Sequence, residues 1–246
     1  MIEFSGKTAL ITGAGSGIGK ATAELFHQLG AKVLLADINA SAAAEAAKVL
    51  DPTGKTASAF GYDAADRASA DNTVAACIEA FGGLDYLVAA AGIYRKQSIA
   101  EMTDEQWREM MGVNLDGIFY ITRAAIPHFS EGGAIVNLAS IAANFGGRLT
   151  RGHYGASKGG VMAYTRGLAK ELAPKVRVNC LNPGIVETPM ADDPADLLSP
   201  EVLEMVPLKR PAQPSEMASI IAFLCSDAAS YITAEAVIAS GGFYIG

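Results

Sequence analysis

Short apolar runs alternate along the chain with longer amphipathic stretches, and this alternation constrains the fold more than any other feature. We predict strands at residues 8–11, 32–36, 57–62, 84–90, 134–138, 176–181 and 236–239. Helices are predicted between them, at residues 17–29, 41–50, 65–81, 103–111, 113–129, 154–172 and 215–225. Runs such as LDYLVAAAG are apolar throughout, as expected for strands covered on both faces. The pattern predicts an α/β fold, a doubly wound parallel sheet with helices on both faces.

The 246 residues suit a single domain, residues 1–246, because no repeat or low-complexity linker divides them. One segment interrupts the rhythm. Residues 187–211 hold five of the ten prolines. A stretch of this length inside a compact domain is more often a lid or a binding loop than a connector, so we expect a substrate lid around 187–211.

Charge and composition exclude several classes of function. The net charge of −7 disfavours nucleic acid as a partner, and no apolar run approaches the roughly 20 residues of a membrane span. The first residues lack the pattern of a secretory signal. The three cysteines are far apart and the three histidines have no second ligand at metal-site spacing, so we expect no metal and a reduced, cytoplasmic setting.

A glycine-rich turn follows the first predicted strand. The segment TGAGSGIG has glycines at 13, 15, 17 and 19, which departs from the usual G-x-G-x-x-G spacing. Glycine allows a tight turn and close approach of the backbone to a pyrophosphate, which then meets the positive end of the next helix. The position between a strand and an amphipathic helix favours a dinucleotide site.

Asp37 ends the second predicted strand, 18 residues after Gly19. A carboxylate there accepts hydrogen bonds from ribose hydroxyls and repels a 2′-phosphate, which favours NAD over NADP. The alternative is a helix cap before Ser41. Asp63 ends the third strand, where it either reaches the adenine or caps the next helix.

Tyr154 and Lys158 stand at positions i and i+4 and share one face of a helix. A lysine ammonium nearby favours the phenolate, so we expect it to lower the pKa of Tyr154 and to prepare this residue as general base and acid in hydride transfer. Ser140 follows a buried strand and can polarise a substrate oxygen. Asn114 begins a predicted helix, where it holds a water or a backbone group, or simply caps the helix.

Together these residues resemble the short-chain dehydrogenase/reductase family over nearly the whole chain, in its 3-oxoacyl-reductase-like branch. The resemblance implies a Rossmann-type fold, NAD as cofactor and a catalytic tetrad of Asn114, Ser140, Tyr154 and Lys158. The segment NPGIVETP is similar to the one that contacts the nicotinamide. The implied cofactor contacts are Gly13, Ser16, Gly17, Ile18, Gly19, Asp37, Asp63, Ala64, Ala90, Gly92, Tyr154, Lys158, Pro183, Gly184, Val186 and Thr188.

The chain departs from the family pattern at two places. The usual NNAG after the fourth strand reads AAAG, from Ala89 to Gly92, so asparagine side chains that brace the sheet are missing. Ser240 replaces the usual acidic residue before the last glycine pair. The first departure puts local rigidity in doubt rather than activity.

The leading hypothesis is an NAD-dependent dehydrogenase of secondary alcohols, acting in either direction. The first alternative is an NADPH-dependent reductase of 3-oxoacyl thioesters or other carbonyls, against which Asp37 argues. The second is a non-catalytic dinucleotide sensor, against which the complete tetrad argues. The family also implies a homotetramer built on helices 113–129 and 154–172, where Gly159, Gly160 and Ala163 allow close approach. Their apolar residues fit an internal core equally well.

We expect the substrate to be a small-molecule alcohol or ketone, with contacts to Tyr94, Arg95, Ser140, Ala142 and Arg148. Two loops at the carboxyl edge of the sheet carry cations, namely Arg95 and Lys96 on one and Arg148 and Arg151 on the other. Such a mouth would attract an anionic alcohol. Solvated loops explain the same cations, and the apolar neighbours Ile93, Tyr94 and Phe145 suit a hydrophobic alcohol instead.

Overall fold

The predicted sheet is confirmed. The structure, a computed structural model, describes residues 2–190 and 198–245. Within these residues one sheet of seven parallel strands has the order β3-β2-β1-β4-β5-β6-β7. The strands are β1 (Thr8–Thr12), β2 (Lys32–Asp37), β3 (Ala57–Gly61), β4 (Leu84–Ala89), β5 (Phe129–Leu138), β6 (Val176–Pro183) and β7 (Ala236–Ala239). The order reverses between β1 and β4, and ligands of such sheets bind in the crevice beyond the carboxyl ends there.

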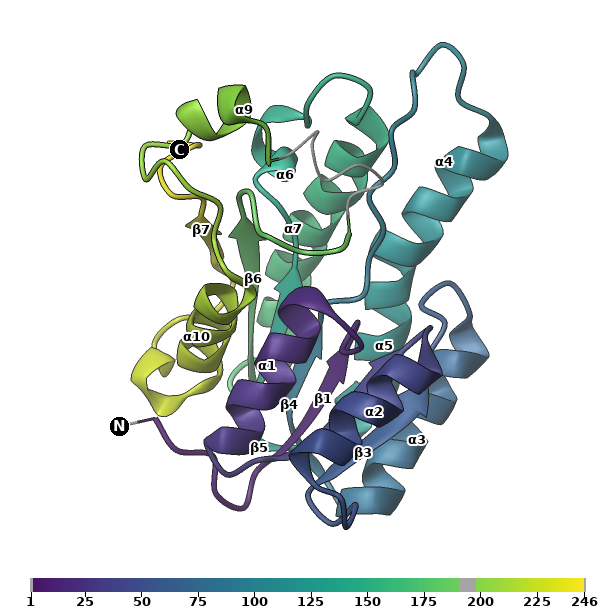
Figure 1. The fold of residues 1–246 in the computed structure, drawn as a ribbon. Helices are drawn as coiled ribbons and strands as arrows, with labels where there is room; N and C mark the ends of the chain where they lie inside the picture. The colour runs from purple at the N-terminus through teal and green to yellow at the C-terminus, as the bar shows by residue number, and fades with distance from the viewer. Residues whose placement is uncertain (1, 191–197, 246) are drawn as a thin grey trace.

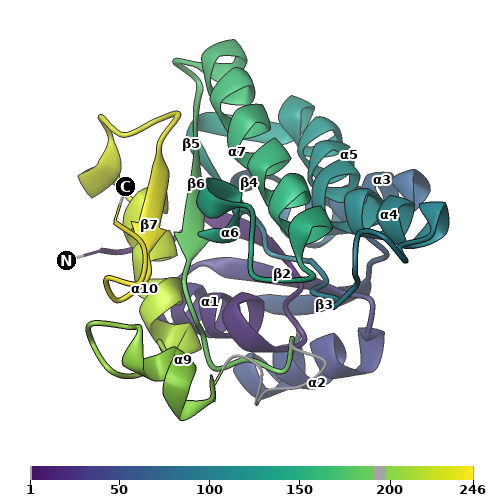
Figure 2. The ribbon, with the colours of Figure 1, turned by 90° about the horizontal axis from the view of Figure 1, so that it is seen from above.

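Helices cover both faces of the sheet (Figures 1 and 2). One face carries α1 (Gly17–Gln28), α2 (Ala40–Leu50) and α10 (Pro214–Cys225), and the other carries α3 (Arg67–Phe81), α5 (Gly117–Ala125) and α7 (Gly152–Leu172). Each face has its own apolar core. Ala9 and Ile11 of β1 point into the first core and Leu10 into the second, because successive strand residues face opposite ways.

The long helical pattern before β5 is broken into pieces. A helix α4 (Asp104–Met111) continues through a π-helical segment, Gly112–Asp116, into α5, and a 3-10 turn Ile126–His128 ends it. The predicted helix end at residue 129 is wrong, since Phe129 already begins β5 and pairs with Leu84. Pro127 lies in the 3-10 turn, and a proline has no N–H to continue the ladder of helical hydrogen bonds.

The two ends of the segment predicted as a lid lie side by side. Val186 and Ala212 form an isolated parallel bridge, with hydrogen bonds from Glu187 N to Ala212 O and from Ala212 N to Ile185 O, both 2.9 Å. Between them the structure describes a short helix, α9 (Pro200–Glu204), and residues 191–197 lie outside the described part. Two further short elements were not predicted, α6 (Ala142–Phe145) and a 3-10 turn Asp227–Ala229.

The described residues were compared with the expectations of no membrane span and no metal site. None of their helices combines the length and apolarity that a membrane crossing requires. Nor do they contain a group of three or more histidine, cysteine or acidic side chains placed to hold a metal ion.

Candidate active site

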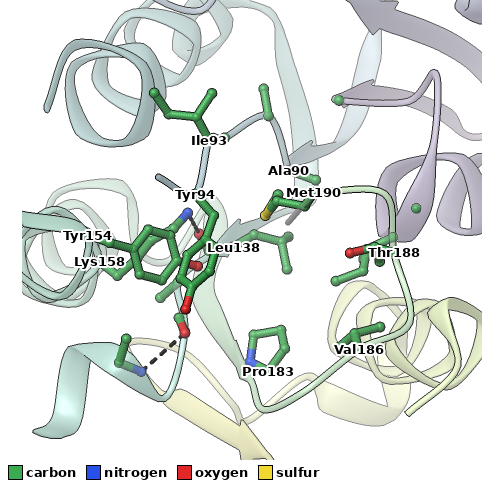
Figure 3. Close-up of a pocket in the computed structure, with 18 of the residues that line it drawn as sticks. Ala90, Ile93, Tyr94, Leu138, Tyr154, Lys158, Pro183, Val186, Thr188 and Met190 are labelled. Atoms are coloured by element: carbon green, nitrogen blue, oxygen red, sulfur yellow. Dashed lines mark hydrogen bonds between the residues drawn. The ribbon is translucent and has the colours of Figure 1, made fainter. Parts of the chain in front are cut away.

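A cavity of about 570 Å³ lies beyond the carboxyl ends of the strands. It extends from the turn after β1 to the loop after β5, with the segment after β6 along one side (Figure 3). Every expected cofactor contact lines this cavity, and so do Tyr94, Arg95, Ser140, Ala142 and Arg148. Of the predicted site residues, Asn114 is the one absent from the described lining.

The glycine turn has the backbone that its sequence predicts. Gly13 and Gly17 have φ of +66° and +52°, the left-handed region that favours glycine. A Cβ on Gly19 would overlap the Gly13 carbonyl group, so the turn and the helix start fit together only without side chains. Ser16 is the N-cap of α1 but its side chain makes no capping hydrogen bond within the described structure. Residues 16–19 line the cavity, so the start of α1 borders it, as an anion site at a helix N-terminus requires.

Asp37 is held against this turn. One carboxylate oxygen, Oδ2, accepts a hydrogen bond from Gly15 N at 2.9 Å, and Oδ1 accepts one from Asn39 N at 2.8 Å. The cap of α2 is Asn39, whose side chain accepts from Ala42 N, so the helix-cap alternative for Asp37 is wrong.

Asp63 likewise lines the cavity without capping a helix. Its Oδ1 accepts a hydrogen bond from Ala65 N at 2.9 Å and closes the turn after β3. The cap of α3 is Asp66, which accepts from Ala68 N and Ser69 N. The structure thus leaves Asp63 beside Ala64 at the same end of the cavity as Asp37.

Tyr154 and Lys158 project from α7 into the cavity, as Figure 3 shows. Both side chains are buried, and Lys158 is only 4% exposed. Its Nζ donates a 2.7 Å hydrogen bond to the carbonyl oxygen of Leu138 and lies 5.9 Å from the centre of the Tyr154 ring. The hydroxyl of Ser140 hydrogen-bonds with the Tyr154 side chain, while its Oγ accepts from Ala142 N at 3.1 Å.

The pKa of Tyr154 moves opposite to the prediction. Burial raises it to about 12, a neighbouring Tyr94 adds to the rise, and the hydrogen bond with Ser140 only partly offsets them. Burial also lowers the pKa of Lys158 to about 8. The predicted lowering of the Tyr154 pKa by Lys158 is wrong for the protein alone, because desolvation of the phenolate dominates and the ammonium is bonded to the Leu138 carbonyl.

Asn114 lies mid-helix in the π-helical segment, so both its predicted place at a helix start and its alternative as a cap are wrong. It is fully buried. Its Oδ1 accepts from Ile93 N at 2.8 Å and its Nδ2 donates to Ile93 O at 3.0 Å. Nδ2 also contacts Ser157 Oγ at 3.2 Å. A wider π-turn at a functional site is common, and this one points an amide at the backbone of the loop after β4.

The AAAG loop is braced without the missing asparagines. Thr12 Oγ1 accepts hydrogen bonds of 3.1 Å from both Ala90 N and Ala91 N. A Cβ on Gly92 would come within 3.1 Å of Asn114 Oδ1 and 3.5 Å of Lys158 Nζ, so this loop passes tightly between them. At the other departure, the Ser240 Oγ accepts from Tyr244 N at 3.2 Å and closes the C-terminal turn.

Three of the four predicted mouth cations, Arg95, Arg148 and Arg151, line the cavity. Lys96 lines a neighbouring recess of about 380 Å³, which it shares with Tyr94 and both arginines of the second loop. The apolar side chains Ile93, Tyr94 and Phe145 line the same cavity.

Sequence reasoning missed several lining residues. Phe243 follows the last strand and packs on Phe145, with ring centres 6.4 Å apart, so the C-terminal segment closes one side of the cavity. Met190 and Glu109 line it as well. Phe243 could have been predicted, because it lies beyond the carboxyl end of a parallel strand. Met190 and Glu109 could not, because their places depend on how the segment after β6 and the helix α4 pack against the rest of the fold.

Comparisons with known proteins identify relatives of the chain. The family model described as enoyl-(acyl carrier protein) reductase matches residues 13–244. A cyclohexanol dehydrogenase of an Acinetobacter strain is 38% identical over 245 residues, 98% of this chain and 96% of its own. A short-chain dehydrogenase/reductase of Brucella melitensis, named as a glucose/ribitol dehydrogenase, superposes with a TM-score of 0.95 at 44% identity, over 100% of this chain and 99% of its own. A 3-ketoacyl-(acyl-carrier-protein) reductase of the same organism, solved with NADH, gives 0.90 at 37% identity, over 99% and 100%.

Proposed function

Because the chain belongs to the short-chain dehydrogenase/reductase family of hydride-transfer oxidoreductases, we propose that it transfers a hydride between NAD and a secondary alcohol or ketone. The observation that carries the proposal is the meeting of Tyr154 and Ser140 in one cavity with the glycine turn. A hydride donor or acceptor and a proton-transfer group are both needed to interconvert an alcohol and a ketone, and this cavity has a place for each.

Each member of the tetrad has a distinct task in this proposal. The Tyr154 hydroxyl takes the alcohol proton during oxidation and returns it during reduction. Ser140 donates to or accepts from the substrate oxygen, and Lys158 holds the inner wall through its hydrogen bond to the Leu138 carbonyl. Asn114 acts indirectly. Its side chain fixes the backbone of Ile93, and this holds the loop after β4 in place beside Lys158.

The residues around the turn fit a nicotinamide dinucleotide. The φ angles of Gly13 and Gly17, and the clash that a Cβ on Gly19 would cause, leave a cradle of bare backbone at the start of α1. Gly17 approaches Thr188, since a Cβ there would lie 3.2 Å from the Thr188 methyl, so the segment after β6 borders the same cradle. When bound, the cofactor would supply the hydride acceptor or donor.

Asp37 supports NAD rather than NADP. Its two hydrogen bonds to backbone N–H groups fix a carboxylate at the turn, where a 2′-phosphate would meet like charge. The alternative, an NADPH-dependent 3-oxoacyl reductase, is favoured by the likeness to a 3-ketoacyl reductase, yet that structure was solved with NADH. The substrate class and the cofactor must therefore be tested separately.

The test is a panel of secondary alcohols, ketones and a 3-oxoacyl thioester, each assayed with both cofactors by nicotinamide absorbance. We expect turnover of a secondary alcohol with NAD, and its loss in Tyr154→Phe. Turnover of the thioester alone, with NADPH, would replace the proposal by its alternative. Binding of NAD without turnover of any panel member would favour the dinucleotide sensor.

We further propose one domain over residues 1–246 with a lid at 187–211, a reduced cytoplasmic setting and a homotetramer. The bridge between Val186 and Ala212 supports the lid, and three free, buried cysteines fit the setting. The exposed Phe119 on α5 supports an interface. Gly160 does not, because a Cβ there would meet Leu115 of the same chain at 2.7 Å.

A further inference from the structure

A guanidinium is buried at the wall of the cavity. Arg151 is 5% exposed and lines the cavity just before the first turn of α7. Its guanidinium carbon lies 4.5 Å from the centre of the Tyr94 ring. A cation at this distance over an aromatic face is attracted by the negative face of the ring. Arg151 therefore stacks on one face of the Tyr94 ring.

The Tyr94 ring continues the stack to the proposed proton-transfer group. The centres of the Tyr94 and Tyr154 rings are 4.8 Å apart and their planes are 88° apart, an edge-to-face contact (Figure 3). Ala142 and Met110 complete the apolar cluster around Tyr154. A tyrosine side chain pivots about two bonds, and a ring packed edge-on blocks one direction of that movement.

The backbone is strained where it presents Arg151. Thr150, a β-branched residue, has φ of +62°, and Gly147 has φ of +86° with a would-be Cβ 2.9 Å from Arg151 O. The strained turn is tied to the loop of Tyr94 by a 2.9 Å hydrogen bond from Gln97 N to Thr150 O. Strain of this kind persists where surrounding contacts enforce it, and it gathers at functional sites.

From these three observations we infer that Tyr94 is a positioning residue for Tyr154, and that Arg151 acts through Tyr94. The inference rests on the proposed role of Tyr154 in proton transfer. Arg151 holds the Tyr94 ring, the ring holds the orientation of Tyr154, and the Tyr154 hydroxyl stays beside Ser140. Neither partner needs to contact the reacting atoms for this effect.

The test is a double-mutant cycle on kcat, measured with NAD and the panel alcohol that the unaltered enzyme turns over fastest. Tyr94→Leu should lower kcat about tenfold while KM for the alcohol stays within about threefold, the size expected for one lost aromatic pair. Arg151→Met should lower kcat in the unaltered background. It should have no further effect in Tyr94→Leu, because the ring through which Arg151 acts is then already absent.

Tyr94→Phe distinguishes positioning from mere packing. The ring and both stacking contacts remain, so kcat should return to within about threefold of the unaltered enzyme. Recovery of kcat by the ring alone, with the KM for the alcohol within about threefold in both variants, is a result that a purely structural role would not give.

Arg123→Met is the matched control, because Arg123 lies 4.8 Å over the Phe119 ring on α5, outside the cavity. Arg123→Met should leave kcat unchanged. Thermal unfolding of every variant checks that each one is folded. Two results would overturn the inference: an unaltered kcat in Tyr94→Leu, or an equal loss from Arg151→Met in both backgrounds. If Tyr154→Phe itself retains full activity, the proposed function fails instead.

Discussion

Replacing Lys158 by methionine should abolish activity while stabilising the protein at neutral pH. Burial lowers the pKa of Lys158 from 10.5 to about 8. The fall corresponds to about 3 kcal/mol that the folded state loses when the side chain must be charged. Methionine has a similar length and no charge, so this cost disappears. The Leu138 carbonyl then loses its donor, which costs about 1–3 kcal/mol, and a net gain of about 1 kcal/mol remains.

The dependence on pH is the sharper part of this prediction. Below pH 8 the ammonium is charged in both states, so the unaltered protein carries the full cost. Between pH 8 and 10.5 the folded protein releases the proton while the unfolded chain keeps it, so the cost fades as pH rises. The advantage of Lys158→Met in the free energy of unfolding should therefore shrink by about 3 kcal/mol between pH 7 and pH 10.5.

Urea unfolding at a series of pH values measures this difference directly. Lys170→Met is the control, since Lys170 lies on the same helix with its side chain exposed, and it should show no such trend. A difference between Lys158→Met and the unaltered protein that does not change with pH would refute the reasoning, because Lys158 would then be solvated in the folded state.

Three further predictions concern the proposed function. Tyr154→Phe should lower kcat by about 10²–10⁴-fold with NAD affinity retained, and Tyr164→Phe on the same helix is the control. The rate of alcohol oxidation by the unaltered enzyme should rise with pH, because in the proposed mechanism the phenolate is the base. Asp37→Asn should reduce the preference for NAD, measured as the ratio of kcat/KM for the two cofactors, by at least about tenfold, and no preference in the unaltered enzyme would show that Asp37 does not read the ribose. Light scattering at micromolar concentration should give the mass of a tetramer, and a monomer mass would end that proposal.

Sequence patterns predicted the strands well because each strand is short and buried on both faces. In β1, the neighbouring residues Ala9, Leu10 and Ile11 alternate between two different cores, yet all three are apolar, so the run is visible without knowing which face each residue covers. Phe129 shows the limit of this method. It is followed by Ser130, Glu131 and two glycines, which look like a turn, and only pairing with Leu84 on the neighbouring strand makes it part of β5.

Which side chains share the cavity was largely predictable from the sequence, but their pKa values were not. A carboxylate at the end of β2 is placed by the strand alone, so Asp37 could be located from the chain. Asn114 could not, because its π-turn and its bonds to Ile93 depend on a loop 21 residues away. The pKa of Tyr154 was predicted in the wrong direction because spacing reveals Lys158 at i+4, whereas the burial that dominates comes from tertiary neighbours.

Several costs to stability converge on this one cavity. Lys158 is charged and buried at neutral pH, Arg151 is buried at the N-cap of the same helix, and Thr150 has a strained backbone. Substitutions that relieve any of these costs would stabilise the chain, so their presence argues that the arrangement is kept for what it does. The same reasoning separates the cavity from the rest of the fold. In the two apolar cores a change that relieves strain should leave activity intact, whereas at Lys158, Thr150 or Arg151 a gain in unfolding free energy should come with a loss of turnover.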